Sequence, residues 1–193
     1  MNDVINTVLR DRERILSRIS PKKLADYDFT QTHLKSTNVA TDLDYQRVYK
    51  SFYVMGRRSG TWYQFYFALL EREKLNRSIT FEAVLRTTFE NMGGRVEPSF
   101  SSKLVATIRP EAPIYDDVVR NNLGIAKPHY YKPARVRLLE ALAAYKQIEG
   151  FYAVALKSDA FGTLKAEFDR RFPAFTHFTN TKKLDVLLWQ WRN

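Results

Sequence analysis

The chain has 193 residues, of which 45% are hydrophobic and 14% aromatic, so it can bury a real core and is not a disordered protein. It contains no cysteine, which excludes disulfides, cysteine nucleophiles and cysteine-ligated iron–sulfur clusters. The formal net charge of +10 favours a polyanionic partner, with nucleic acid first, against the alternative of a merely basic surface. No apolar run approaches about 18 residues and no signal peptide is evident, so we expect a cytoplasmic protein without a membrane partner.

Apolar residues recur at helical spacing along most of the chain, and no segment has a clear strand pattern. The pattern predicts helices over residues 4–19, 43–55, 61–74, 81–92, 98–108, from 115, 134–148, 158–171 and 179–191. Residues 26–42 are polar and predict a long connection, and Gly150 is expected to end the helix before it. We therefore predict an all-α fold, a compact bundle of roughly eight helices forming one domain over residues 1–193, with two packed lobes as the alternative.

Residues 80–125 form the central helix-hairpin-helix of this prediction. The first helix should end at Gly93-Gly94, because glycine adopts the left-handed backbone that ends helices. The second should begin after Pro98, with Ser99 as its N-cap. Lys103 lies near the start of this second helix, and Asp116 begins a third helix 13 positions later (116 − 103). An amine and a carboxylate at adjoining helix ends can face one cleft.

This segment resembles the helix-hairpin-helix DNA glycosylases, whose hairpin signature is Leu-Pro-Gly-Val-Gly-x-Lys, followed downstream by Val-Asp-x-His-Val. Pro98, Phe100 and Lys103 fall on the proline, an apolar residue and the lysine of that signature. Asp116 falls on its aspartate. The segment is most similar to small bacterial members of the 8-oxoguanine branch.

The segment also departs from the signature at three positions. Ser99 and Ser101 stand where the hairpin has glycine, and Val118 stands where the later motif has histidine. The interval between the lysine and the aspartate is several residues shorter than in the family. These changes affect the close approach of bare backbone to a phosphate, which glycine permits.

The resemblance implies a DNA glycosylase with associated abasic-site (AP) lyase activity. Such an enzyme flips a damaged or modified base out of double-stranded DNA and excises it, here an oxidised purine such as 8-oxoguanine. Lys103 would be the nucleophile that forms a Schiff base, and Asp116 the essential carboxylate. The three histidines lie far apart, so we expect no metal and no cofactor, and we expect the protein to act as a monomer.

Other residues are candidates for DNA contact. Those expected to touch phosphates, from basic segments or the hairpin, are Arg57, Arg58, Arg95, Ser99, Ser101, Ser102 and Lys127. Those expected to stack on a base are Trp62, Phe100, Tyr130 and Tyr131. Arg57 and Arg58 are also explained as charges at a helix end, and the two tyrosines as side chains that pack on helix ends.

Two further functions stay open from the sequence. The chain can be a non-catalytic helix-hairpin-helix module that binds DNA, including modified DNA in genome defence. It can also be an interaction protein whose positive charge is incidental. DNA binding that weakens with salt would distinguish the module from the interaction protein.

Overall fold

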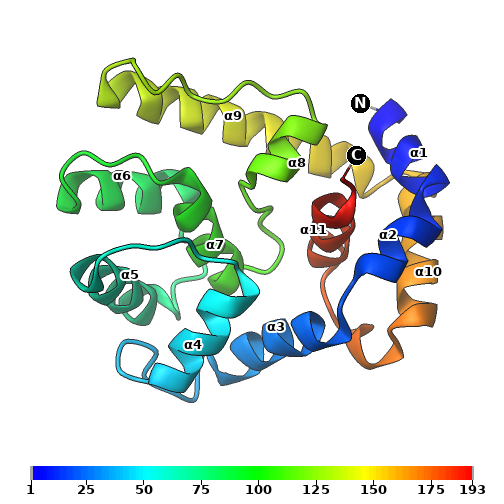
Figure 1. Ribbon diagram of the computed structural model, residues 1–193, viewed down its shortest axis with the longest axis horizontal. Helices are drawn as coiled ribbons and strands as arrows, with labels where there is room; N and C mark the ends of the chain where they lie inside the picture. Colours follow the sequence, from blue (N-terminus) through cyan, green and yellow to red (C-terminus); the bar gives the residue numbers. More distant parts are fainter. Residues whose placement is uncertain (1, 193) are drawn as a thin grey trace.

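The structure is a computed structural model that describes residues 2–192. Throughout this range the regular elements are helical, which confirms the all-α prediction (Figure 1). They are α1 Asn2–Arg10, α2 Arg12–Arg18, α3 Pro21–His33, α4 Leu43–Phe52, α5 Gly60–Glu73, α6 Phe81–Asn91, α7 Pro98–Ile108, α8 Asp117–Asn122, α9 Ala134–Ala155, α10 Asp159–Arg171, the short 3-10 helix η1 Pro173–Phe175, and α11 Asn180–Gln190. The count exceeds eight because the first predicted helix is divided into α1 and α2, and because α3 was not predicted.

Short polar side chains mark several helix starts, as the sequence indicates. The carboxylate of Asp42 accepts a hydrogen bond of 2.8 Å from the backbone of Tyr45 and so begins α4. The hydroxyl groups of Ser158 and Thr179 do the same for α10 and α11. Each cap satisfies a backbone N–H that has no partner inside the helix.

The expected connection over residues 26–42 is wrong in its first half, because α3 continues to His33. Pro21 occupies the first turn of α3, a position where its missing N–H is not needed and its fixed φ favours the helix. The hydroxyl of Thr30 bonds to the carbonyl of Tyr27 within the same helix, so polar residues are accommodated. Only residues 34–42 connect α3 to α4.

The expected end of a helix at Gly150 is also wrong, because α9 runs through it to Ala155. Phe151 and Tyr152, which directly follow the glycine, are both 3% exposed and belong to the core. Their burial offsets the roughly 1 kcal/mol that a glycine costs in a helix interior.

Two hydrophobic clusters hold the helices together, and the candidate site lies where they meet. The first contains buried side chains from α1, α2, α9, α10 and α11. The second is smaller and lies mainly among α4, α5 and α7. Figure 1 shows α4, α5 and α7 on one side of the molecule and α1, α2 and α10 on the other, with α11 nearer the middle. The prediction of a single domain over residues 1–193 stays a prediction.

Within the described range, none of the helices combines the length and the apolar content that crossing a membrane requires.

Candidate nucleic-acid and catalytic site

The hairpin between α6 and α7 carries the candidate lysine. Gly93-Gly94 has φ angles of 65° and 74°, which confirms the expected left-handed stop after α6. Pro98 is the first residue of α7, and Glu97 occupies the cap position without making a side-chain cap. Ser99 is therefore inside the helix and is not its N-cap, because proline is well suited to the first helical position.

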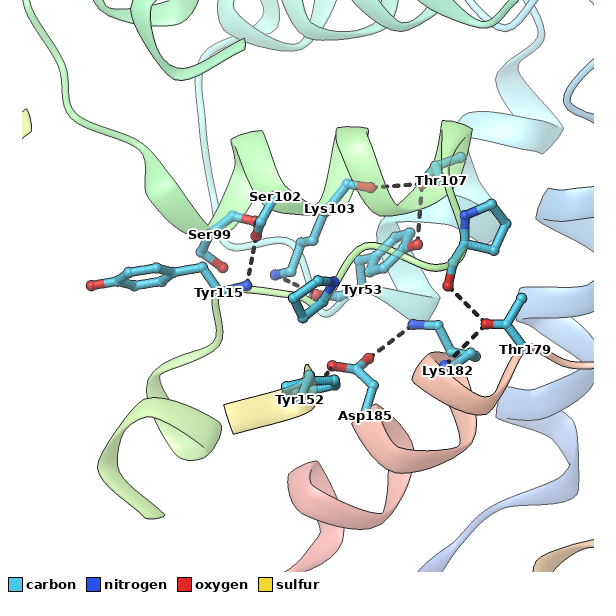
Figure 2. A network of polar contacts seen from close by, with 12 residues as sticks. Tyr53, Ser99, Ser102, Lys103, Thr107, Tyr115, Tyr152, Thr179, Lys182 and Asp185 are labelled. Carbon is cyan, nitrogen blue, oxygen red and sulfur yellow. Dashed lines mark hydrogen bonds and ion pairs between the residues drawn. The ribbon is translucent and has the colours of Figure 1, made fainter. Parts of the chain in front are cut away.

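Lys103 lies in the second turn of α7, and only 7% of the residue is exposed. Its Nζ donates a hydrogen bond of 2.9 Å to the backbone carbonyl of Tyr53 (Figure 2). Among residues 2–192, no carboxylate lies within 4.0 Å of this ammonium group. Burial lowers the pKa of Lys103, and the negative charges of Asp116 and Asp185 only partly oppose that effect. The lysine is thereby brought nearer to the neutral form that a nucleophile requires.

Asp116 occupies the N-cap of α8, where its Oδ1 accepts a hydrogen bond of 2.7 Å from the backbone of Val118. A carboxylate at a helix start is usually stabilised by the positive end of the helix dipole. Here burial outweighs that effect and raises the pKa of Asp116, although the Val118 N–H and Lys103 both lower it. The site therefore contains an amine and a carboxylate whose charged forms are both disfavoured by loss of water.

A hydrogen bond between α7 and the start of α8 fixes these two groups relative to each other. The hydroxyl of Ser102 accepts a hydrogen bond of 2.9 Å from the backbone of Tyr115 (Figure 2). The loop between the helices is also held by α11, since the Thr179 hydroxyl donates to the carbonyl of Pro110 at 2.7 Å. Because Ser102 and Tyr115 are the sequence neighbours of the candidate pair, this contact joins the two backbone segments that carry the amine and the carboxylate.

Two cavities meet at Lys103 and Asp116, and we call them the outer and the inner cavity. The outer cavity has a volume of about 460 Å³ and lies between the start of α7, the start of α8 and the segment that precedes α9. Its lining comprises Val54, Gly56, Arg58, Val96, Glu97, Pro98, Ser99, Phe100, Lys103, Tyr115, Asp116, Asp117, Lys127, Pro128, Tyr130 and Arg137.

The cations of the outer cavity differ in how well they are paired. Arg58 is held by the carboxylate of Glu97 at 3.0 Å, and its guanidinium lies 4.7 Å from the centre of the Phe100 ring. Lys127 pairs with Asp117 at 3.1 Å, and both side chains are exposed. Arg137 has a buried Nε without a hydrogen-bond partner in the described chain. Among residues 2–192, no carboxylate lies within 4.0 Å of the Arg137 guanidinium, so its charge is the one left available to an anionic ligand.

The inner cavity has a volume of about 270 Å³ and is bounded by α2, α3, the end of α4 and α11. The exposed area of its walls is mainly apolar, although six of the lining residues are charged. The lining residues are Ile19, Ser20, Lys23, Leu24, Phe52, Tyr53, Val54, Lys103, Ile114, Asp116, Lys182, Asp185, Val186, Trp189, Gln190 and Arg192. Apolar walls with few polar groups are typical of small-ligand sites.

A buried ion pair forms part of the inner cavity. Lys182 and Asp185 are 2.9 Å apart on α11, and Tyr152 donates a second hydrogen bond to the same carboxylate at 3.2 Å (Figure 2). Burial alone opposes the charge on Lys182, but the attraction of Asp185 and other contributions leave the pKa of this lysine raised. Lys182 is therefore a stable cation, in contrast to Lys103.

Val54 belongs to the rim of both cavities and has an unusual backbone. Its φ of 48° is left-handed, which is uncommon for a β-branched residue. Val54 follows the end of α4, where the N–H of Met55 donates a hydrogen bond of 3.0 Å to the carbonyl of Lys50. This is the Schellman motif, which usually has glycine at the position that Val54 occupies. Backbone strain of this kind clusters at functional sites.

The structure brings together about half of the residues that the sequence nominated. Besides the candidate pair, the outer cavity contains Arg58, Ser99, Phe100, Lys127 and Tyr130. Arg57, Arg95 and Tyr131 contribute to neither of the two cavities as the described residues form them.

Burial contradicts the predicted contacts of three residues. Trp62 is fully buried and stacks on Tyr66 with ring centroids 5.2 Å apart, so its ring cannot meet a base. The hydroxyl of Ser101 donates to the carbonyl of Glu97 within the hairpin, and Ser102 holds the start of α8. The serines are 1% and 0% exposed, respectively, and their role is to shape the site from inside.

The sequence did not nominate Val54, Arg137, Lys182 or Asp185. Lys182 and Asp185 are three positions apart in the same helix, which is the spacing of an intrahelical ion pair. That spacing was the only signal, since α11 reaches α7 and α8 through tertiary packing. In the part of the chain that the structure describes, no three His, Asp or Glu side chains converge where a metal ion could bind.

No family model, no curated protein and no solved structure matches the chain. The resemblance to helix-hairpin-helix glycosylases therefore rests on the residues of the α6–α8 segment alone. The function has to be argued from the chemistry of the two cavities.

Proposed function

We propose that the protein is a DNA glycosylase with associated AP lyase activity, in which Lys103 is the nucleophile and Asp116 the essential carboxylate. One observation carries this proposal. A buried lysine without a carboxylate partner and a partly buried aspartate line the same two cavities, in a basic protein. Titratable groups whose charged forms are disfavoured by loss of water are frequent at catalytic sites.

The proposed reaction uses the two groups in sequence. The neutral Nζ of Lys103 attacks C1′ of the target nucleotide, the C1′–N bond breaks, and the departing base takes the bonding electrons and a proton. Asp116 stabilises the positive charge that develops on the sugar. The amine on C1′ then opens the sugar ring to a Schiff base, from which β-elimination expels the 3′ phosphate and cleaves the strand.

The two cavities suit different parts of the target nucleotide. The cations of the outer cavity suit the sugar–phosphate backbone, with the guanidinium of Arg137 not engaged in an ion pair within the described chain. The apolar walls of the inner cavity suit a flipped base, and the Lys182–Asp185 pair offers a donor and an acceptor beside it. An oxidised purine such as 8-oxoguanine is the first base to test. Action as a monomer on duplex DNA in the cytoplasm belongs to the same proposal.

Borohydride trapping tests the chemistry directly, because reduction converts a Schiff base into a stable covalent adduct. The protein is incubated with duplex oligonucleotides that carry either 8-oxoguanine or an abasic site. We expect an adduct that Lys103→Ala abolishes and that Lys165→Ala retains, since Lys165 is a partly exposed lysine on α10 that lines neither cavity. An adduct that persists in Lys103→Ala would assign the nucleophile elsewhere.

A cavity-filling variant separates the binding of the base from the chemistry at the sugar. Val186 lines the inner cavity and is only partly buried, so Val186→Phe reduces the space without opening the core. We expect this variant to lose excision of the base and to keep trapping on abasic DNA, which has no base to accommodate. Equal loss on both substrates would contradict the assignment of the inner cavity to the base.

A non-catalytic DNA-binding module is the second candidate, and one observation favours it. Lys103 donates to the Tyr53 carbonyl and Asp116 accepts from Val118, so in the free protein each group already has a structural partner. The module would show DNA affinity that falls with salt and is retained in Lys103→Ala, together with no adduct on either duplex. Such a protein could serve in genome defence against modified DNA.

A further inference from the structure

Tyr130 and Tyr131 are the most conspicuous aromatic side chains on the surface, with 87% and 71% of their areas exposed. They lie in residues 126–133, between α8 and α9, which we call the tyrosine loop. Other large apolar residues with more than half of their area exposed lie singly on separate segments, such as Leu43 and Leu75. Two adjacent exposed rings indicate a binding surface, because exposure of contiguous apolar surface to water is unfavourable.

The tyrosine loop is held by contacts at its two ends. Lys127 pairs with Asp117 at the start of α8. Glu140 on α9 accepts a hydrogen bond from the backbone of His129 at 3.1 Å and also pairs with Lys132. Pro128 and Pro133 further restrict the backbone. The rings are therefore presented from a supported turn, which lowers the entropy lost when they bind a partner.

The position and charge of the loop point to one kind of partner. Tyr130 lines the outer cavity together with Lys103, Asp116 and Arg137. Arg135 follows the loop on the first turn of α9 and is exposed. Rings flanked by cations complement a nucleic acid, whose bases stack on aromatic faces while its phosphates meet the cations. A purely apolar partner would leave these cations without a counter-charge.

We propose that Tyr130 and Tyr131 stack on the DNA bases beside the flipped nucleotide and occupy the gap that it leaves in the duplex. This inference rests on the proposed function, because that function supplies the partner, duplex DNA with one flipped nucleotide. It assigns the tyrosines to the duplex, outside the cavity that receives the base. A base pair opened next to the loop would otherwise close again and expel the reactive sugar from Lys103.

Fluorescence of 2-aminopurine measures this stacking. The full chain is titrated onto two duplexes that carry 2-aminopurine, one intact and one with a tetrahydrofuran abasic analogue opposite the probe. We expect quenching only on the second duplex, and we expect Tyr130→Ala and Tyr131→Ala each to raise its Kd about tenfold. Tyr130→Phe and Tyr131→Phe should retain the affinity, because the aromatic face is kept.

Leu75→Ala is the matched control, since Leu75 is 70% exposed but lies away from both cavities. Alanine variants of the tyrosines that bind the abasic duplex as tightly as the unsubstituted protein, or that lose affinity equally for both duplexes, would overturn the inference. Borohydride trapping by these variants separates the two proposals. Stacking without any Lys103 adduct defeats the enzyme alone, and an adduct without stacking defeats this inference alone. Absence of binding to either duplex would overturn both.

Discussion

Lys103 on α7 and Lys182 on α11 are both buried lysines that line the inner cavity, yet their surroundings give them opposite properties. Lys182 has a carboxylate at 2.9 Å and the rings of Tyr27, Phe52 and Tyr53 within 6 Å, at 4.7, 5.5 and 5.7 Å. Lys103 has one carbonyl and the Phe100 ring at 5.5 Å. The pKa of Lys182 is accordingly raised and that of Lys103 lowered. Full pairing stabilises a cation, whereas incomplete pairing leaves an amine able to react.

Lys183 repeats the pattern of Lys182 one position later. It is 1% exposed, and its ammonium is shared between the carboxylate of Asp169 and the carbonyl of Thr176. Lys183 joins α11 to α10, whereas Lys182 pairs with Asp185 within α11. The lysines of α11 are thus paired structural cations, and burial alone does not identify a catalytic lysine.

Removal of the paired lysine should have the largest effect. Lys182→Met leaves Asp185 buried without its counter-charge, so we expect the free energy of unfolding to fall by roughly 3–5 kcal/mol. Urea denaturation followed by circular dichroism measures the change. The double variant Lys182→Met with Asp185→Leu removes both charges and should recover most of the loss. A single-variant loss below about 1 kcal/mol would mean that the pair is solvated.

The contact between α7 and α8 should be next in size. Ser102→Ala removes the acceptor of the Tyr115 N–H, and an unsatisfied buried donor costs about 1–3 kcal/mol. Ser101→Ala is the control, because the Ser101 hydroxyl bonds only to a carbonyl at the start of its own helix. If the two variants unfold at the same urea concentration, the contact between Ser102 and Tyr115 contributes no more to stability than the hydrogen bond of Ser101 does.

The unpaired lysine should contribute much less to stability. Lys103→Met keeps the apolar part of the side chain and removes one hydrogen bond, so we expect a loss of about 1 kcal/mol in the free energy of unfolding. The same urea experiment compares this variant directly with Lys182→Met. A loss as large as that of Lys182→Met would remove the distinction between the two lysines.

The titration of Lys103 gives the most sensitive test. Its pKa should lie below the ordinary 10.5, because burial disfavours the ammonium, and Asp116→Asn should lower it further, because Asp116 supports the positive charge. NMR of the protein with ¹³C-dimethylated lysines resolves this group. A pKa at or above 10.5, or an upward shift in Asp116→Asn, would contradict the assignment.

The pH dependence of trapping follows from the same two groups. Adduct formation should rise with pH and level off below 10.5, where the Lys103 amine is neutral. On the acid side it should fall through a pKa above 3.8, where Asp116 becomes protonated. Single-turnover trapping on abasic DNA over this pH range measures both limbs. If adduct formation does not rise with pH, deprotonation of Lys103 does not control its rate.

Local sequence signals predicted those parts of the fold that local interactions determine. The glycine stop of α6 and the caps of α10 and α11 follow from residues within one turn of each boundary. The start of α3 was missed because Pro21 can end one helix or begin the next, and only the packing of Tyr27 decides between them. Helical spacing alone also does not decide burial in α9, where Val136 and Leu139 are 38% and 59% exposed.

The candidate site divides in the same way. Lys103 and Asp116 are close in sequence, and Ser102 joins their helices, so a short motif was enough to pair them. The inner cavity requires α2, α3, α4 and α11 to meet, and no sequence spacing encodes that arrangement. The prediction for Trp62 was wrong because the sequence alone does not distinguish an aromatic side chain that stacks on a base from one that fills a core. In the structure Trp62 is part of the core.

The hydrogen bond from Lys103 to the Tyr53 carbonyl has a consequence for helix α4. A helix ends with carbonyls that lack N–H partners, and Tyr53 lies directly after the last residue of α4, so the lysine acts as a C-terminal cap supplied from another helix. An amine joined to a sugar carbon cannot keep both roles. Reaction would therefore uncap α4 beside the strained Val54, and the amides of residues 53–56 would exchange their hydrogens faster in the covalent complex. Catalysis and helix stability would compete for a single nitrogen atom.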